Sequence, residues 1–204
     1  MEGHVMEEYL KRAYKIEIGP NFPCRVAGFT RKASLPRTFR KMGYKVGAEI
    51  GVEYGSQSTR FCRENPGLKL FCVDSWEPYD FDRAHELGYY VMDPVKNFER
   101  AKEVLAPYNV TFLKGYSMDV VKTIPEESLD FVYIDANHYY EFIKEDLVEW
   151  SKRVRKGGIV SGHDYYVSPN CDVIQAVDEH VKEYGIDRWF LTDDTSCSYF
   201  WVKK

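Results

Sequence analysis

The sequence lacks the features that mark several classes of protein. Its five cysteines include no C-x-x-C pair, and their odd number argues against a framework of disulfide bonds. No apolar run is long enough to cross a bilayer, and the glutamate-rich residues 1–8 do not have the pattern of a signal peptide. We therefore expect a cytoplasmic protein of a reducing compartment, with no membrane partner.

Excess positive charge is also missing. The formal net charge is −4 at pH 7, so the composition indicates no surface for nucleic acid. The chain contains no internal repeat, and its 204 residues are enough for one domain with a substantial core. We expect a single domain over residues 1–204, with an N-terminal helical cap over 1–43 and the main fold over 44–204.

From residue 46 the sequence predicts a strand, a glycine turn, a helix and a second strand. The first strand covers 46–50, the helix covers 56–65 and the second strand covers 68–73. A βαβ unit of this kind binds a nucleotide-like ligand, because glycines let the backbone approach it and the helix start offers unpaired N–H groups. Asp74 ends the second strand, where its carboxylate can accept hydrogen bonds from a ribose diol.

The spacing of the glycines separates two classes of cofactor. A dinucleotide site is typical of G-x-G-x-x-G, whose third glycine admits a pyrophosphate. Here the pattern is Glu49-x-Gly51-x-x-x-Gly55, and the carboxylate of Glu49 would repel a pyrophosphate but suits a ligand with a positive amine or sulfonium. The pattern resembles the first motif of the class I S-adenosylmethionine-dependent methyltransferases. A glycine turn without a ligand is the alternative.

This resemblance implies S-adenosylmethionine as the cofactor. In that family the acid of the first motif lies near the methionine end of the cofactor, and the acid that ends the second strand holds the ribose. Glu49 and Asp74 occupy these two positions here. The implied cofactor contacts in this part of the chain are Glu49, Gly51, Gly55, Ser56, Ser58, Asp74 and Ser75.

Residues 76–93 form an unusually long insert between the second strand and the next helix. Such a connection usually has about 2–6 residues, and this one is also rich in aromatic side chains. We expect a lid or substrate loop, because inserts at the carboxyl edge of a parallel sheet commonly have that role. Trp76 could reach an adenine or the substrate, and a packing role for its ring is equally open. The aromatic side chains could also form an interface, so a homo-oligomer is open too.

The chain after the insert continues the alternation of helices and strands. Asp93-Pro94 is typical of a capped helix start, and the next strand is predicted over 110–113. In the methyltransferase family the residues after this strand border the adenine. The resemblance therefore implies cofactor contacts from Tyr116 and Ser117.

Four further strands complete the predicted sheet. They cover 129–135, 159–162, 188–191 and 198–202. Residues 156–158 are expected to end a helix with a left-handed turn, and Asp172 to cap another helix. The short polar link before the last strand predicts an antiparallel hairpin, as in class I methyltransferases. The expected fold class is α/β: a Rossmann-like three-layer sandwich with a seven-stranded, mostly parallel sheet whose last strand is antiparallel.

The segment 25–41 is locally basic. Its basic residues are Arg25, Arg31, Lys32, Arg37, Arg40 and Lys41. A solvated face of the cap accounts for this charge without any ligand. The alternative is a site where an acidic or sugar-phosphate substrate enters beneath the cap.

Four titratable residues follow two neighbouring strands of the predicted sheet. Asp135 and His138 lie at the end of one strand, and His163 and Asp164 follow the other. Because the carboxyl edge of an open α/β sheet is its ligand crevice, we expect these side chains to converge beside the cofactor, with Asp135 in contact with it. Imidazole titrates near neutral pH, which makes His138 the first candidate for a general base and His163 the second, with Asp135 orienting a histidine.

The sequences around these residues carry a second resemblance. The run Ile-Asp-Ala-Asn-His-Tyr-Tyr-Glu from residue 134 and Gly-His-Asp-Tyr from residue 162 resemble the small-molecule O-methyltransferases of sugar, macrolide and natural-product pathways. The resemblance covers residues 44–166 and implies methylation of a hydroxyl on a small molecule, with no nucleic acid as partner.

Relatives in that group bind Mg²⁺ with carboxylates at these strand ends, and Asp135 and Asp164 match two of the ligand positions. His163 stands where relatives with the clearest metal sites carry an acid, and magnesium prefers oxygen ligands. Mg²⁺, another divalent metal and no metal are therefore all open.

Two other functions fit parts of the sequence. An NAD-dependent oxidoreductase would share the βαβ unit, but the missing third glycine and the carboxylate of Glu49 argue against it. A non-catalytic S-adenosylmethionine-binding module that serves a partner protein would share the cofactor site. The two histidines and two acids at one sheet edge favour an enzyme.

Overall fold

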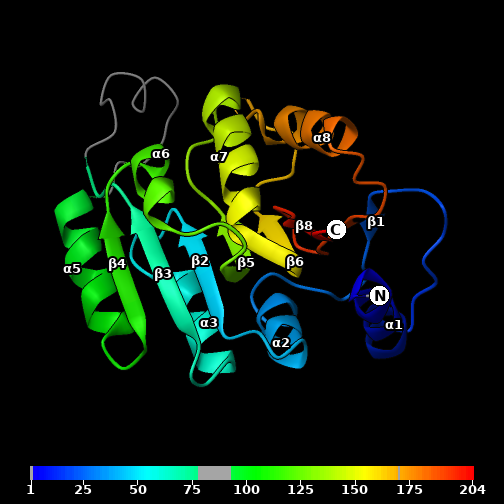
Figure 1. Ribbon diagram of the computed structural model, residues 1–204, viewed down its shortest axis with the longest axis horizontal. Coiled ribbons are helices and arrows are strands. Elements are labelled where there is room, and N and C mark those ends of the chain that lie inside the picture. The colour runs from blue at the N-terminus through cyan, green and yellow to red at the C-terminus, as the bar shows by residue number, and fades with distance from the viewer. Residues whose placement is uncertain (1, 78–92, 170) are drawn as a thin grey trace.

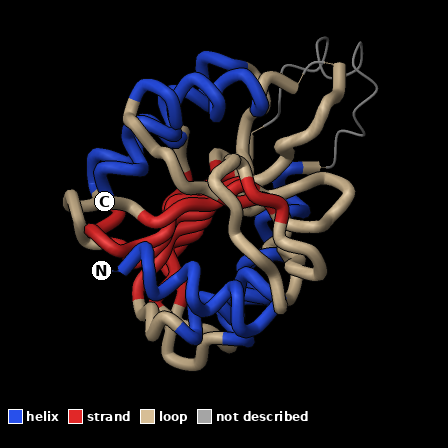
Figure 2. Tube along the Cα trace, turned by 90° about the vertical axis from the view of Figure 1, so that its right-hand side faces the viewer, coloured by secondary structure: helices blue, strands red, loops and turns tan. Residues whose placement is uncertain are grey.

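The computed structural model describes residues 2–77, 93–169 and 171–204. These residues form a three-layer α/β sandwich, in which a mixed sheet lies between two layers of helices (Figures 1 and 2). The strand order is β1-β7-β8-β6-β5-β2-β3-β4. The strands are β1 (Cys24–Arg25), β2 (Val46–Ile50), β3 (Lys69–Asp74), β4 (Val110–Lys114), β5 (Leu129–Ile134), β6 (Val154–Gly162), β7 (Phe190–Leu191) and β8 (Tyr199–Val202).

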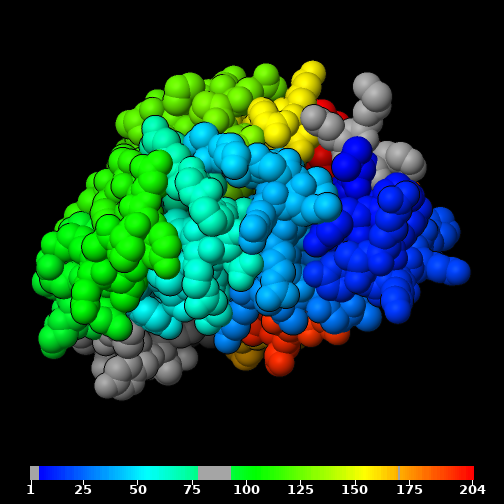
Figure 3. All heavy atoms as spheres, turned by 90° about the horizontal axis from the view of Figure 1, so that it is seen from below, coloured from blue at the N-terminus to red at the C-terminus, as the bar shows by residue number. Residues whose placement is uncertain are grey.

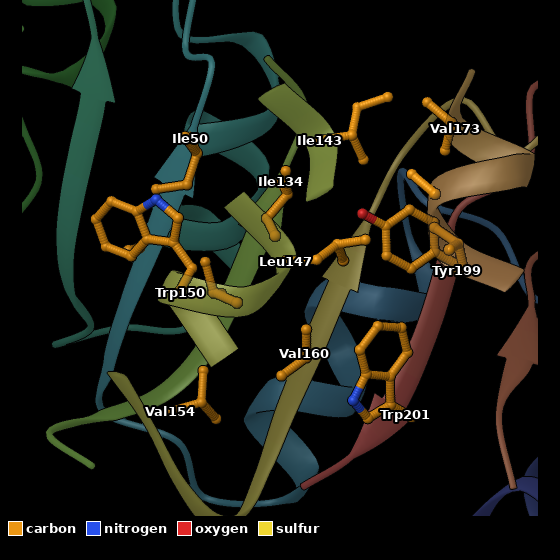
Figure 4. Packing of buried hydrophobic residues seen from close by; sticks show 14 of the residues in the cluster. Ile50, Ile134, Ile143, Leu147, Trp150, Val154, Val160, Val173, Tyr199 and Trp201 are labelled. Atoms are coloured by element: carbon orange, nitrogen blue, oxygen red, sulfur yellow. The ribbon is translucent and has the colours of Figure 1, made fainter. Parts of the chain in front are cut away.

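Each face of the sheet has its own layer of helices and its own buried core. One face carries α1 (Glu2–Tyr14), α2 (Ser34–Lys41), α3 (Ser56–Glu64) and α5 (Pro94–Leu105). The other face carries α6 (Ser117–Val120), α7 (Tyr140–Arg153) and α8 (Val173–Glu183). Figure 4 shows the second core, where Leu147 of α7 lies beside Tyr199 of β8 and Val160 of β6, and Trp150 of α7 lies on the side of Ile50 of β2.

The sheet confirms the predicted α/β class, with one difference in the number of strands. Strand β8 is antiparallel to β6 and to β7, as expected for the last strand. The described part of the chain contributes eight strands rather than seven, because β1 adds to the edge in parallel with β7. A strand of two residues is too short to show the alternation by which strands are recognised in a sequence.

The N-terminal segment packs into the same core as the sheet. Met6 and Leu10 of α1 share a buried cluster with Phe39 of α2 and Phe200 of β8. Figure 3 views the molecule from below and shows the dark-blue N-terminal segment beside the lighter-blue residues that include α2. Arg188 also holds α1, because its guanidinium forms a bidentate pair with the carboxylate of Glu7.

Two predicted helix ends are wrong. Residues 156–158 lie inside the nine-residue strand β6, and α7 ends earlier, at Arg153. The pairing of β5 with β6 shifts register between Leu129 and Phe131, and the glycines lie in this irregular part of β6. Gly157 has φ +76° and donates its N–H to the carbonyl oxygen of Lys203. Asp172 precedes α8 but makes no side-chain cap; its carboxylate instead accepts a hydrogen bond of 3.2 Å from the backbone N–H of Tyr140.

The predicted helix start at Asp93 is confirmed, whereas most of the insert before it lies outside the described residues. Asp93 caps α5 as predicted, since its carboxylate accepts hydrogen bonds of 3.1 and 3.2 Å from the N–H groups of Val95 and Lys96. Residues 78–92 lie outside the described residues, so the role expected for the insert stays a prediction. Among the helices of the described residues, none has the length and apolar character needed to cross a membrane.

Candidate active site

The glycine turn lies where the sequence predicts it, between β2 and α3. Gly51 has φ +86°, and its N–H donates to the carbonyl oxygen of Val73 at 2.9 Å. A Cβ at Gly51 would lie 2.0 Å from the carbonyl oxygen of Asp135, so no other residue fits between the turn and β5. Gly55 has φ +84° and precedes the first turn of α3. The turn thus brings β2, β3 and the end of β5 together.

Asp74 fastens this turn to the end of β3. One of its carboxylate oxygens accepts hydrogen bonds of 2.9 Å from the N–H groups of Val52 and Glu53, and the other accepts one of 2.8 Å from Trp76. A carboxylate has about four lone-pair sites, so these bonds leave acceptor capacity for a ribose diol. The predicted ribose contact fits this position and stays a prediction.

Glu49 is buried behind the turn, with only 1% of its surface exposed. Its carboxylate accepts a hydrogen bond from the hydroxyl of Ser58, which is also buried. Burial raises the pKa of Glu49 well above its usual range, although the Ser58 hydrogen bond opposes this. The structure therefore places Glu49 and Ser58 beneath the turn, whereas Ser56 is exposed at the start of α3.

Trp76 takes the packing position that the sequence left open. Its side chain is 3% exposed, and the ring centroid lies 4.4 Å from that of Phe98 on α5. The indole Nε1 donates to the carbonyl oxygen of Glu53 at 2.8 Å. This indole joins α5 to the glycine turn, so its buried position does not favour the predicted contact with the adenine. Ser75 accepts a hydrogen bond of 3.3 Å from the N–H of Glu77.

The two residues predicted to border the adenine have different surroundings. Tyr116 is exposed just after β4, while the hydroxyl of Ser117 lies against α7. Ser117 Oγ donates to Asp146 and accepts a hydrogen bond of 2.7 Å from Trp150 Nε1. Asp146 is buried, which raises the pKa of its carboxyl to about 7. Asp146 was not predicted from the sequence, although its place on the apolar face of α7, three residues after Ile143, was a signal for it.

The predicted histidine–acid cluster is assembled at the carboxyl ends of β5 and β6. His138 Nε2 lies 2.8 Å from Asp164 Oδ2, and His163 Nδ1 lies 3.0 Å from Asp164 Oδ1. His163 Nδ1 is also 3.5 Å from Asp135 Oδ1. Asp164 has φ +58°, a left-handed conformation, and its carboxylate engages both imidazoles. Asp164, rather than Asp135, is thus the partner of His138.

The carboxylates of the cluster favour charged imidazoles. Burial alone would lower the pKa of His163, but its hydrogen bonds with Asp135 and Asp164 raise the pKa to about 9. At His138, burial also lowers the pKa, but the hydrogen bond with Asp164 outweighs it, so the pKa of His138 is raised. Burial opposes ionisation of Asp164, yet the hydrogen bonds from both histidines hold its pKa below the usual value.

Three residues of the cluster have the spacing of a metal site. Among the described residues, one ligand atom from each of Asp135, His138 and Asp164 lies within 4.8 Å of the others. The set fits one divalent cation, with two carboxylates and one imidazole as ligands. Because an imidazole is included, the donor set suits a transition metal such as Zn²⁺ or Fe²⁺ better than Mg²⁺.

Arg31 joins this cluster from a distant part of the chain. Its Nη1 lies 3.3 Å from Asp135 Oδ2, and the side chain is 23% exposed. The sequence indicates a basic segment around Arg31, with the entry of an acidic substrate as one alternative, but it predicts no contact between Arg31 and the cluster. The only signal was that basic segment itself, since 104 residues separate the two partners.

Known proteins share the segment that contains both the glycine turn and the cluster. The family model described as "Methyltransferase domain" matches residues 48–165, which is more than half of the chain and includes both features. The chain belongs to this methyltransferase family. The matched region runs from β2 to the residues just after β6, as the class I resemblance predicted.

Solved structures share the fold of this methyltransferase domain over nearly its whole length. The O-methyltransferase from Bacillus cereus in complex with SAH has a TM-score of 0.61 at 15% identity, over 99% of this chain and 90% of that one. TomG from Streptomyces achromogenes, an O-methyltransferase involved in tomaymycin synthesis and solved with SAM, has a TM-score of 0.60 at 18% identity, over 98% and 89% of the two chains. Identities this low establish the fold alone.

A curated relative is also similar in sequence. The uncharacterized protein y4gI of Sinorhizobium fredii is 22% identical over an alignment of 147 residues that covers 69% of this chain. The methyltransferase domain described here spans 14% of the length of that relative.

Proposed function

We propose that this methyltransferase domain transfers the methyl group of S-adenosylmethionine to a hydroxyl oxygen of a small molecule. The observation that carries the proposal is the contact between the glycine turn and the cluster. Gly51 touches the backbone of Asp135, whose side chain is part of the cluster. A cofactor over the turn would therefore present its methyl group beside the groups that can activate a hydroxyl.

The cofactor would lie over Gly51 to Ser58, with the carboxylate of Asp74 accepting hydrogen bonds from the ribose. Asp74 is held by three backbone N–H groups, so its free lone pairs point from a fixed position. The polar edge after β4, formed by Tyr116 and Ser117, would border the adenine. The solved O-methyltransferases that share the fold with SAM or SAH bound support this choice of cofactor.

The transfer is a direct displacement at carbon. The acceptor oxygen forms a bond to the methyl carbon while the carbon–sulfur bond breaks, and its electron pair returns to sulfur to give S-adenosylhomocysteine. The acceptor oxygen is a poor nucleophile until its proton is shared with a base. His138 is the base we propose, because its side chain is 31% exposed whereas that of His163 is 10% exposed.

Asp164 would set the geometry of this base. It engages His138 at Nε2 and so leaves Nδ1 as the nitrogen that takes the acceptor's proton. His163, which contacts both carboxylates, would keep Asp164 in place and is the second candidate for the base.

If a divalent metal is bound, Asp135, His138 and Asp164 would hold it. It would supply a Lewis acid that lowers the pKa of a bound hydroxyl. The base role would then fall to His163.

The test is product formation from S-adenosylmethionine with a panel of catechols, sugars and polyketide alcohols. We expect a methyl ether and S-adenosylhomocysteine in equal amounts by mass spectrometry, with a parallel reaction in chelator to show whether a metal takes part. Tight cofactor binding without any methylated product would indicate a binding module instead. Oxidation of the same alcohols with NAD would indicate an oxidoreductase.

A further inference from the structure

Arg31 differs from the other basic residues of its segment. Lys32 is exposed, and Arg37 is a largely exposed residue that pairs with Glu64 at 3.7 Å, as a solvated face would require. The Arg31 guanidinium instead points to the sheet edge and lies 3.3 Å from Asp135. The basic segment is thus a solvated surface, except at Arg31.

The backbone of Arg31 is fixed on both sides. Its N–H donates to Asp194 Oδ2 at 2.6 Å, and its carbonyl oxygen accepts from the buried Gln57 of α3 at 3.3 Å. Asp193 holds the same segment, because its carboxylate accepts a hydrogen bond of 2.9 Å from Gly28. The polar link between β7 and β8 therefore fixes the backbone from which the guanidinium extends, which lowers the entropy cost of binding a ligand.

The guanidinium is not saturated by its carboxylate partner. It carries five N–H donors and binds a carboxylate best through two parallel hydrogen bonds. Its contact with Asp135 is a single Nη1–Oδ2 pair, and Asp135 is shared with His163. The buried hydroxyl of Tyr133 is a further hydrogen-bond partner, so the two partners together leave part of the five donors unused. A guanidinium remains charged under all ordinary conditions, so a partly buried Arg31 retains the capacity to bind a second anion.

We infer that Arg31 is a specificity-determining residue that binds an anionic group, a carboxylate or a phosphate, on the methyl acceptor. This inference rests on the proposed function, because it places the acceptor at the same sheet edge as Asp135. The acceptor class is a hydroxylated acid or a sugar phosphate, rather than a neutral alcohol.

Two matched pairs of probes test the inference on the full chain saturated with S-adenosylhomocysteine. The pairs are 3,4-dihydroxybenzoate with 3,4-dihydroxybenzamide, and glucose 6-phosphate with glucose. Calorimetry should show that the anionic member of at least one pair binds about 10–100-fold more tightly, the range for a hydrogen bond to a charged group. The pair that shows the preference distinguishes a carboxylate from a phosphate.

The variants separate recognition from structure. Arg31→Gln should abolish the preference, and Arg31→Lys should keep part of it, since lysine retains the charge without the planar fork. Lys32→Gln is the matched control, because it removes the same charge from the exposed neighbour and should leave the preference intact.

Two results would overturn the inference. One is a wild-type protein with no preference in either pair. The other is an Arg31→Gln protein that weakens both members of a pair equally, which is what the loss of a purely structural ion pair would do. Failure of the proposed function would look different: the preference would persist, but no methyl group would pass from S-adenosylmethionine to any acceptor.

Discussion

Gly51 lies against the backbone of Asp135. The N–H of Asp135 donates to Ile50 at 2.7 Å, and a Cβ on Gly51 would stand 2.0 Å from the carbonyl oxygen of Asp135 and 2.5 Å from its carbonyl carbon. A single backbone contact therefore joins the turn that should hold the cofactor to the cluster that should activate the acceptor. A change at Gly51 should disturb both.

Gly51→Ala should destabilise the protein by about 3 kcal/mol or more, since it combines a left-handed backbone with overpacking. Gly67→Ala is the matched control, because Gly67 has φ +81° but no atom of the described residues within 4 Å of its Cβ position. We expect the control to lose about 1–2 kcal/mol, the cost of the left-handed conformation alone. Urea denaturation measures both values, and equal losses would show that the contact with Asp135 is loose.

His138→Ala should fold, bind S-adenosylhomocysteine like the wild type and lose about 10²–10⁴-fold in turnover, which is the usual contribution of a general base. The comparison is His163→Ala, assayed with the same acceptor. Full turnover in the His138 variant together with loss in the His163 variant would transfer the base role to His163. Full turnover in both would remove the imidazoles from the mechanism.

His180 should make the stability of the fold sensitive to acid. It is buried on α8 between the rings of Tyr184 and Trp201, at centroid distances of 4.5 and 5.7 Å. Burial, and then the charge of Lys144, lower its pKa to about 4. The unfolded chain, with a pKa near about 6.5, therefore binds more protons between these values, and stability is lost as pH falls through this window.

The variant His180→Phe keeps the ring packing and removes the titration. Between pH 6.5 and pH 4 the wild type should lose up to about 3 kcal/mol more than the variant, as a pKa shift of about 2.5 units implies. Denaturant unfolding across this pH range gives the two slopes. Parallel slopes would mean that His180 becomes protonated in the folded protein without cost.

The sequence predicts the structure best where a feature depends on residues that are close together in the chain. The strand–turn–helix around Gly51 and the helix cap at Asp93 depend on residues within a few positions, and both form as predicted. The cluster of His138 and Asp164 is also predictable, because parallel strands bring their carboxyl ends to one edge.

Contacts between distant segments account for what the sequence does not reveal. Arg31 reaches Asp135 from a backbone held by Asp194 of the link between β7 and β8 and by Gln57 of α3, and no local pattern encodes that contact. Strand β1 is a strand only through its parallel pairing with β7, which is distant in the sequence. The glycines at 157 and 158 look like a helix end because a helix precedes them, whereas the fold uses them inside a strand. The orientation of Trp76 depends on Phe98, which follows the long insert.

The most direct test of this account is a calorimetric titration of S-adenosylhomocysteine, with NAD in parallel, into the wild type and the Asp74→Ala variant. Asp93→Ala serves as the control, because Asp93 also accepts hydrogen bonds from backbone N–H groups but lies at the start of α5. The account predicts that wild type and control bind S-adenosylhomocysteine and not NAD, and that Asp74→Ala weakens this binding by about 1.5–3 kcal/mol. Binding of NAD in its place, or unchanged affinity in the Asp74 variant, would contradict the cofactor site.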